Sequence, residues 1–83
     1  MNDKQSTMPI KKILRTIENE RARNKFLIFC IEIYKNACHL SGTEVAELFT
    51  NKSVDKYLYE NFDVLHTQGA NYLIRDIEEY IKN

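Results

Sequence analysis

The segment FDVLHTQGANYLIRDI, residues 62–77, holds the polar side chains that come closest to a reactive site. His66 could act as a general base, but a base needs a nucleophile beside it, and no serine or cysteine stands in a nucleophile-elbow motif. Asp63 and Asp76 flank the histidine in the sequence, and either could accept its proton or cap a helix. We therefore expect His66 to make a structural hydrogen bond or to contact a partner, and we expect no enzymatic activity.

The residues that follow His66 are typical of a junction between two helices. Thr67 or Gln68 stands where a helix N-cap belongs, and Gly69 lets the backbone turn tightly or approach a neighbour. Capping and turn formation between the two helices would explain most of the polar residues in this segment. A partner could also dock on this surface, whose candidate partner-binding residues are Asp63, His66, Thr67 and Gln68.

The two cysteines do not suggest metal or disulfide chemistry. Cys30 and Cys38 are eight residues apart within a helical pattern, about 80° out of phase, so one helix cannot join them in a disulfide. Cys38 and His39 are neighbours that point to different sides, and the sequence has no C-x-x-C or H-x-x-x-H pair. We expect two buried thiols, no metal and no cofactor.

Length and composition exclude several classes of protein. A chain of 83 residues makes one domain with a modest core, which excludes a large enzyme with a cleft between domains. The longest apolar run, residues 26–31, is far shorter than the roughly 20 residues that span a bilayer. The first residues show no export signal. We expect a cytoplasmic protein without a membrane span.

Hydrophobic periodicity predicts helices and no strands. Residues 25–40 are apolar around much of a helix circumference, which is typical of a helix in the middle of a bundle. Ser41 and Glu44 form an S-x-x-E capping box that opens the next helix, and Ser53 can cap another. Residues 72–81 repeat as an amphipathic C-terminal helix. The predicted fold is all-α, a small bundle of four to five helices, whose expected core residues include Tyr34, Leu48, Phe49, Leu58 and Ile77.

The first 25 residues differ from the rest of the chain. Residues 1–8 are polar, and we expect a disordered tail there. Residues 9–25 are expected to form a basic amphipathic helix, and residues 26–83 a helical domain. Residues 18–25 contain a single apolar residue, so they either bridge two helices or link them as a solvated rod. The N-terminal helix carries a narrow apolar stripe, a candidate partner-binding surface made of Ile10, Ile13, Leu14 and Ile17.

Charge is balanced over the chain but not along it. Residues 1–25 hold seven Lys or Arg and three Asp or Glu, a net charge of +4, whereas residues 26–83 hold five and nine, a net of −4. A basic arm on an acidic body could meet nucleic acid, a second copy or an acidic partner, because such fields raise encounter rates without specifying the partner. A solvated helix face is the simpler interpretation.

Two sequence blocks within residues 26–81 resemble a known family. Its members share an aromatic-rich first helix, an S-G-x-E-V-x-x-L-F block and a Y-D-x-L-H-T-Q-G-x-x-Y-x-x-x-D-I ending. The first block corresponds here to Ser41, Gly42, Glu44, Val45, Leu48 and Phe49. The ending corresponds to Phe62 in the usual Tyr place, then Asp63, Leu65, His66, Thr67, Gln68, Gly69, Tyr72, Asp76 and Ile77.

The family is a small bacterial one labelled domain of unknown function 3791, and the resemblance carries no established activity. Genes of its members are often seen beside other small genes, some of which resemble ADP-ribosyltransferase toxins. The resemblance therefore implies a toxin-neutralising or accessory role. The basic segment of residues 9–25 lies outside the resembling blocks, so the resemblance implies nothing about it.

Two classes of function follow from the sequence. The first is a non-enzymatic protein–protein interaction module, antitoxin-like, in which the apolar stripe or the surface around His66 docks on a protein partner as a helix in a groove. A homodimer is its economical form. The alternative is a helix-turn-helix-like nucleic-acid-binding regulator made by residues 42–50, a TNKS turn and residues 54–61. Asp55 and Glu60 outnumber the single lysine of that second helix, which makes nucleic acid the poorer match.

Overall fold

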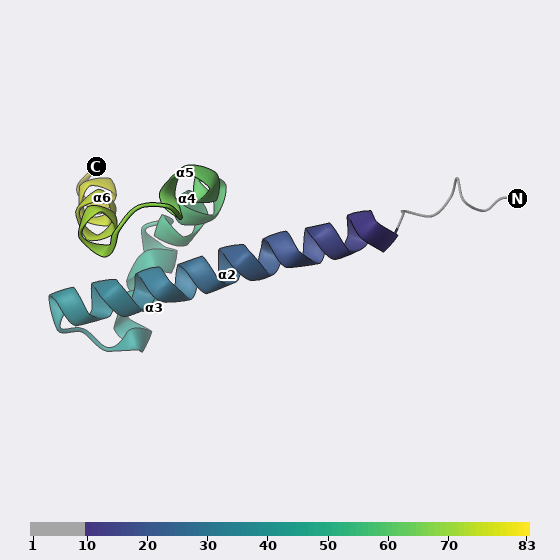
Figure 1. The fold of residues 1–83 in the computed structure, drawn as a ribbon. Helices are drawn as coiled ribbons and strands as arrows, with labels where there is room; N and C mark the ends of the chain where they lie inside the picture. Colours follow the sequence, from purple (N-terminus) through teal and green to yellow (C-terminus); the bar gives the residue numbers. More distant parts are fainter. Residues whose placement is uncertain (1–9) are drawn as a thin grey trace, which may run out of the picture.

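The computed structural model describes residues 10–83, which form helices and no strand. The disordered tail expected for residues 1–8 lies outside the described residues. The helices are α2 (Ile10–Cys38), α3 (Gly42–Asn51), α4 (Val54–Glu60), α5 (Phe62–Leu65) and α6 (Ala70–Lys82) (Figure 1). The predicted all-α bundle of four to five helices is confirmed.

α2 is one continuous helix of 29 residues, about 43 Å long at 1.5 Å per residue. It does not break at the expected boundary between residues 25 and 26. Burial changes there instead: residues 10–25 are exposed apart from the half-buried Arg23, whereas Phe26 is buried. We call residues 10–25 the shaft and residues 26–83 the body. The shaft projects away from the body, as a solvated rod would (Figure 1).

The core of the body lies between one side of α2 and the shorter helices. Phe26, Cys30 and Tyr34 recur every four residues, which places them on the same side of α2. The ring of Tyr34 lies 5.6 Å from that of Phe49 on α3. The remaining buried residues are Val45, Phe49, Val54, Leu58, Leu65, Leu73 and Ile77. This core confirms four of the five expected positions, namely Tyr34, Phe49, Leu58 and Ile77.

Two expectations about burial are wrong. Leu48 is half-buried and packs against the core from its edge. Residues 25–40 do not run through the middle of the bundle, because Ile28 is 61% exposed and Phe29 is 46% exposed. A body of this size has too few helices to surround α2, so the shorter helices cover only one of its sides (Figure 1).

The predicted N-terminal cap is present at the start of α3 but not at the start of α4. The Ser41 hydroxyl accepts the backbone N–H of Glu44 at 3.0 Å, and the Glu44 carboxylate accepts that of Ser41 at 2.8 Å. The capping box is therefore confirmed. Ser53 occupies the N-cap position of α4 with φ at 60°, and its side chain makes no capping hydrogen bond. The prediction that Ser53 caps α4 is wrong in this respect.

Candidate interaction surface

The four apolar residues predicted on the N-terminal helix lie together and uncovered on the shaft. We call Ile10, Ile13, Leu14 and Ile17 the stripe; they are 73%, 42%, 52% and 41% exposed, respectively. Their spacing of three, four and seven residues puts them on one side of α2. Singly exposed apolar side chains are ordinary, whereas large contiguous apolar patches are typical of interaction sites.

The stripe continues along α2 onto the body. Ile28 follows Ile10 by 18 residues, which is five turns of helix, so it lies on the same side. The half-buried Ile31 lies on this side too. Between the stripe and this second apolar group lie three exposed polar residues, Glu20, Arg21 and Asn24. We call the whole side, from Ile10 to Ile31, the outer face of α2. The sequence reasoning missed Ile28 by assigning it to the core, although its five-turn spacing was visible.

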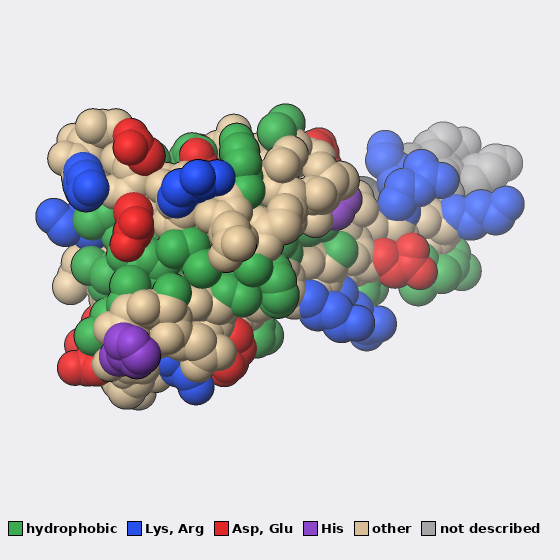
Figure 2. All heavy atoms as spheres, turned by 60° about the vertical axis from the view of Figure 1, so that its left-hand side comes forward, with side chains coloured by type: hydrophobic (Ala, Val, Ile, Leu, Met, Phe, Trp, Pro, Cys, Tyr) green, Lys and Arg blue, Asp and Glu red, His purple; other side chains and the backbone are tan. Residues whose placement is uncertain are grey.

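The shaft is strongly basic around the stripe. Residues 10–25 hold six Lys or Arg and two Glu, a net charge of +4. On the face shown in Figure 2, Lys and Arg side chains outnumber acidic ones on the projecting part of the molecule. The first turn of α2 contains no acidic residue, and Lys11 and Lys12 lie near the positive end of the helix dipole. Within residues 10–25, the basic side chains at this end of the shaft therefore oppose the helix dipole.

Arg23 holds the shaft to the body. Its guanidinium donates from Nη1 to the carbonyl oxygen of Tyr59 at 2.9 Å. The same group lies 5.0 Å from the centroid of the Tyr59 ring and 4.9 Å from that of Phe62, which are cation–π distances. Phe62 in turn meets Phe26 edge to face at 5.6 Å. The sequence reasoning missed Arg23 because its hydrogen bond spans 36 residues.

His66 makes a structural hydrogen bond, as one of the two interpretations of the sequence expected. Its Nδ1 lies 2.7 Å from the carbonyl oxygen of Phe62, and its ring stacks on the Phe62 ring at 4.4 Å. Because a carbonyl oxygen only accepts, Nδ1 carries the proton in this bond. The Asp76 carboxylate accepts the hydroxyl of Tyr57 at 2.7 Å. The Nδ1 proton of His66 thus goes to Phe62, and not to Asp63 or Asp76, either of which the sequence reasoning had allowed.

The other predicted residues of this surface lie on α5 and the turn before α6. Asp63 and Thr67 are exposed and Gln68 is half-buried. α6 begins after Gly69, so the N-cap predicted at Thr67 or Gln68 is wrong. Gly69 has φ at −79°, and a Cβ added there would meet no atom within 4 Å. Gly69 thus makes no close approach to a neighbour and does not use a backbone conformation that favours glycine.

The two predicted sets of partner-binding residues form separate surfaces. The surface around His66 reaches α2 through the stacked rings of His66 and Phe62 and through Arg23. Arg23 follows Ile17 by six residues, which places it about 120° around the helix from the stripe. No hydrogen bond, ring contact or ion pair within residues 10–83 joins the stripe to His66. The outer face of α2 is the more apolar of the two surfaces.

Buried titratable groups of the body show no sign of activation. Cys30 is fully buried, and burial raises the pKa of its thiol to about 12, which keeps the thiol protonated and inert. Burial, followed by the hydrogen bond to Asp76, raises the pKa of Tyr57 to about 12. Within the described residues, no group of three or more His, Cys, Asp or Glu side chains is placed to hold a metal ion.

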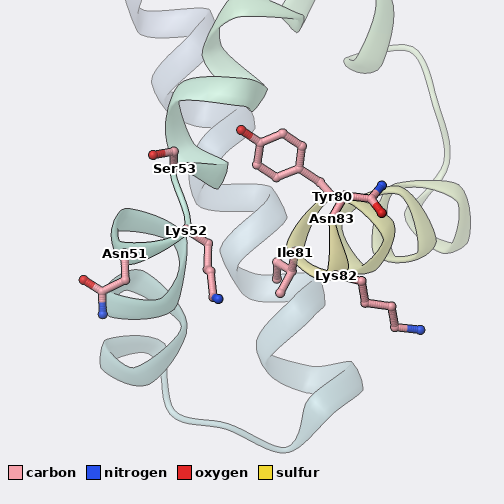
Figure 3. Close-up of a pocket in the computed structure, with 7 residues that line it drawn as sticks. All are labelled: Asn51, Lys52, Ser53, Tyr80, Ile81, Lys82 and Asn83. Carbon is pink, nitrogen blue, oxygen red and sulfur yellow. The ribbon is translucent and has the colours of Figure 1, made fainter.

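A surface hollow of about 670 Å³ lies between the end of α6 and the turn from α3 to α4. Figure 3 shows its lining residues, among which Asn51 and Lys82 point away from each other on opposite sides. Its charged lining side chains are two lysines, Lys52 and Lys82. No helix in residues 10–83 has the length and apolar composition of a membrane span.

Comparison with known proteins separates the shaft from the body. The family model with the description "Protein of unknown function (DUF3791)" matches residues 25–83. This region includes the whole body and the surface around His66, whereas the stripe lies outside it. No curated protein and no solved structure matches the chain. Because the matched region is well over half of the chain, the protein belongs to this family of unknown function, DUF3791.

Proposed function

We propose that this protein is a non-enzymatic protein–protein interaction module that binds its partner through the stripe on the shaft. One observation carries the proposal: four Ile and Leu side chains, 41% to 73% exposed, lie in a row on a helix that projects from the body. Full burial of one such side chain contributes about 1.5–3 kcal/mol. Burial of these four side chains against a partner protein therefore favours binding.

The fold lowers the cost of ordering the stripe when a partner binds. A helix of 16 residues alone is marginal in water, because the first turn is costly to nucleate. Here the shaft extends a helix whose other half is packed in the core, so nucleation has already taken place. Arg23 adds a fixed point at the junction. Anchors spaced at i, i+3, i+4 and i+7 suit a groove or a second helix.

The family resemblance supplies a candidate for the partner. We propose an antitoxin-like or accessory role in the bacterial cytoplasm, beside a toxin-like product of a neighbouring gene. The basic shaft favours an acidic surface on such a partner, because opposite fields raise the association rate. The surface formed by Asp63, His66, Thr67 and Gln68 is the proposed second contact, since most of it is exposed and it belongs to the family region.

A nucleic-acid-binding regulator remains the second candidate, and charge does not favour it. Its recognition helix would be α4, which turns Val54 and Leu58 into the core. One lysine accompanies Asp55 and Glu60 on that helix. A phosphate backbone requires a basic contact surface. The only strongly basic region within residues 10–83 is the shaft, which is not part of the helix-turn-helix-like segment.

The experiment compares three chains, each co-expressed with the product of the neighbouring gene. The first is the wild type and the second carries Ile13→Asp and Ile17→Asp. The control carries Asn19→Asp and Ala22→Asp, which add the same two charges to exposed positions on other sides of the shaft. We expect the stripe variant alone to lose its protein partner, as measured by co-purification and solution mass. Equal capture and equal mass for all three chains would overturn the proposal.

A further inference from the structure

We infer that the partner of the outer face of α2 is a second copy of this chain, with the two α2 helices paired antiparallel. This inference rests on the proposed function and names the occupant of the stripe; the product of the neighbouring gene then binds the resulting dimer, through the surface around His66. Three observations carry it: the order of apolar and polar residues along the outer face, the distribution of charge, and the position of the body relative to that face.

The outer face reads nearly the same in both directions. Its two apolar groups lie at its ends, and its polar group lies in the middle. A twofold axis that crosses α2 between Glu20 and Arg21 places each apolar end of one copy on the other apolar end of the second. In this register Ile10 faces Ile31 and Ile13 faces Ile28, and the remaining stripe residue Ile17 lies opposite Asn24. The overlap from residue 10 to residue 31 is about 33 Å of helix.

Charge selects the antiparallel direction. At the axis, Glu20 of each copy faces Arg21 of the second copy, which makes two symmetric pairs of opposite charge. A parallel pairing would instead place Glu20 beside Glu20 and Arg21 beside Arg21, and like charges at such close range are repulsive. It would also lay one +4 shaft along the other. The antiparallel pairing lays each +4 shaft along a body of net charge −4.

The body leaves room for the second helix. The buried side of α2, centred on Cys30, lies about 150° around the helix from the stripe. The shorter helices therefore occupy one side of α2 and a second copy can occupy the other. Beside the outer face, Leu27 lines a groove of about 520 Å³ with Tyr59 of α4, and Asp55 and Glu60 lie at this groove. A twofold axis then generates two identical contacts from one surface.

The test measures the dissociation constant of the full-length chain by sedimentation over a range of concentrations. We expect the wild type to be a dimer. Glu20→Arg should raise the Kd about tenfold, because both pairs at the axis become repulsive, and adding Arg21→Glu should restore most of the affinity. Ile13→Asp with Ile17→Asp should leave a monomer with the helical circular dichroism retained, whereas Asn19→Asp with Ala22→Asp should remain a dimer.

Three other outcomes would contradict the inference in whole or in part. A monomeric wild type would overturn the inference, and the proposed function would still stand if the stripe variant loses the neighbouring gene's product. A dimer that Ile13→Asp with Ile17→Asp dissociates but Glu20→Arg does not weaken would overturn the antiparallel pairing. A dimer that is indifferent to the stripe substitutions would overturn the inference and remove the support for the proposed function.

Discussion

The two halves of α2 differ in what stabilises them, although they are one helix. The half in the body buries Phe26, Cys30 and Tyr34 against the shorter helices. The half in the shaft is exposed apart from the half-buried Arg23, and it carries basic residues at the end where the helix dipole disfavours them. The family match begins at residue 25, where the shaft ends and the body begins. A continuous helix thus combines the edge of a folded core with an uncovered, projecting segment.

The largest change in the free energy of unfolding is expected when a core side chain of the body is truncated. Phe49 is 1% exposed and packs against Tyr34, so Phe49→Ala should reduce the free energy of unfolding by about 3–5 kcal/mol. Ile13→Ala is the matched truncation on the shaft and should change it by less than about 0.5 kcal/mol in dilute monomer. Urea unfolding measures both. A loss below about 1 kcal/mol for Phe49→Ala would show that the core is placed wrongly.

The next test breaks the junction between the two halves. Arg23→Ala removes the hydrogen bond to Tyr59 and the stacking over Phe62, and should cost about 1–2 kcal/mol. Arg21→Ala removes the same charge from an exposed position on the outer face and should cost much less in the monomer. Thermal unfolding of both variants in dilute solution makes the comparison. Equal losses of stability in the two variants would mean that Arg23 stabilises the protein only through its charge.

A smaller effect is expected at the start of α3, well away from the shaft. Ser41→Ala removes one half of the capping box and should cost about 1 kcal/mol. Ser53→Ala is the control, because Ser53 occupies an N-cap position without a capping hydrogen bond. Chemical unfolding should therefore rank Ser41→Ala as the more destabilising change. The reverse order would show that the cap at Ser53 forms in solution.

The smallest effect concerns pH and should be confined to the body. Folding raises the pKa of Tyr57 from 10.0 to about 12, mainly through burial, so the folded state favours the neutral phenol. Its contribution to stability is complete below pH 10 and is lost as the pH rises through about 12. Tyr57→Phe should reduce the loss of melting temperature over this range. It should not abolish the loss, because Cys30 and Tyr34 also have raised pKa values.

Sequence reasoning succeeded where the determining residues are close together along the chain. The capping box depends on Ser41 and Glu44, three positions apart, and the stripe depends on spacings of up to seven residues. It failed where distant segments meet. The contact of Arg23 with α4 and the hydrogen bond from Tyr57 to Asp76 span 36 and 19 residues, and no local pattern records them. The exposure of Ile28 depends on how much of α2 the other helices cover, which periodicity alone does not determine.

The central claim is that the body stabilises itself whereas the shaft requires a second protein surface. Hydrogen exchange of the wild type, followed by mass spectrometry at several protein concentrations, tests it most directly. We expect the amides of the body half of α2 to be protected equally at every concentration. Those of the shaft should exchange rapidly in dilute solution and slowly once the chain dimerises. A chain that sediments as a monomer while its shaft exchanges as slowly as its body would contradict the claim, because the stripe would then pack on its own chain.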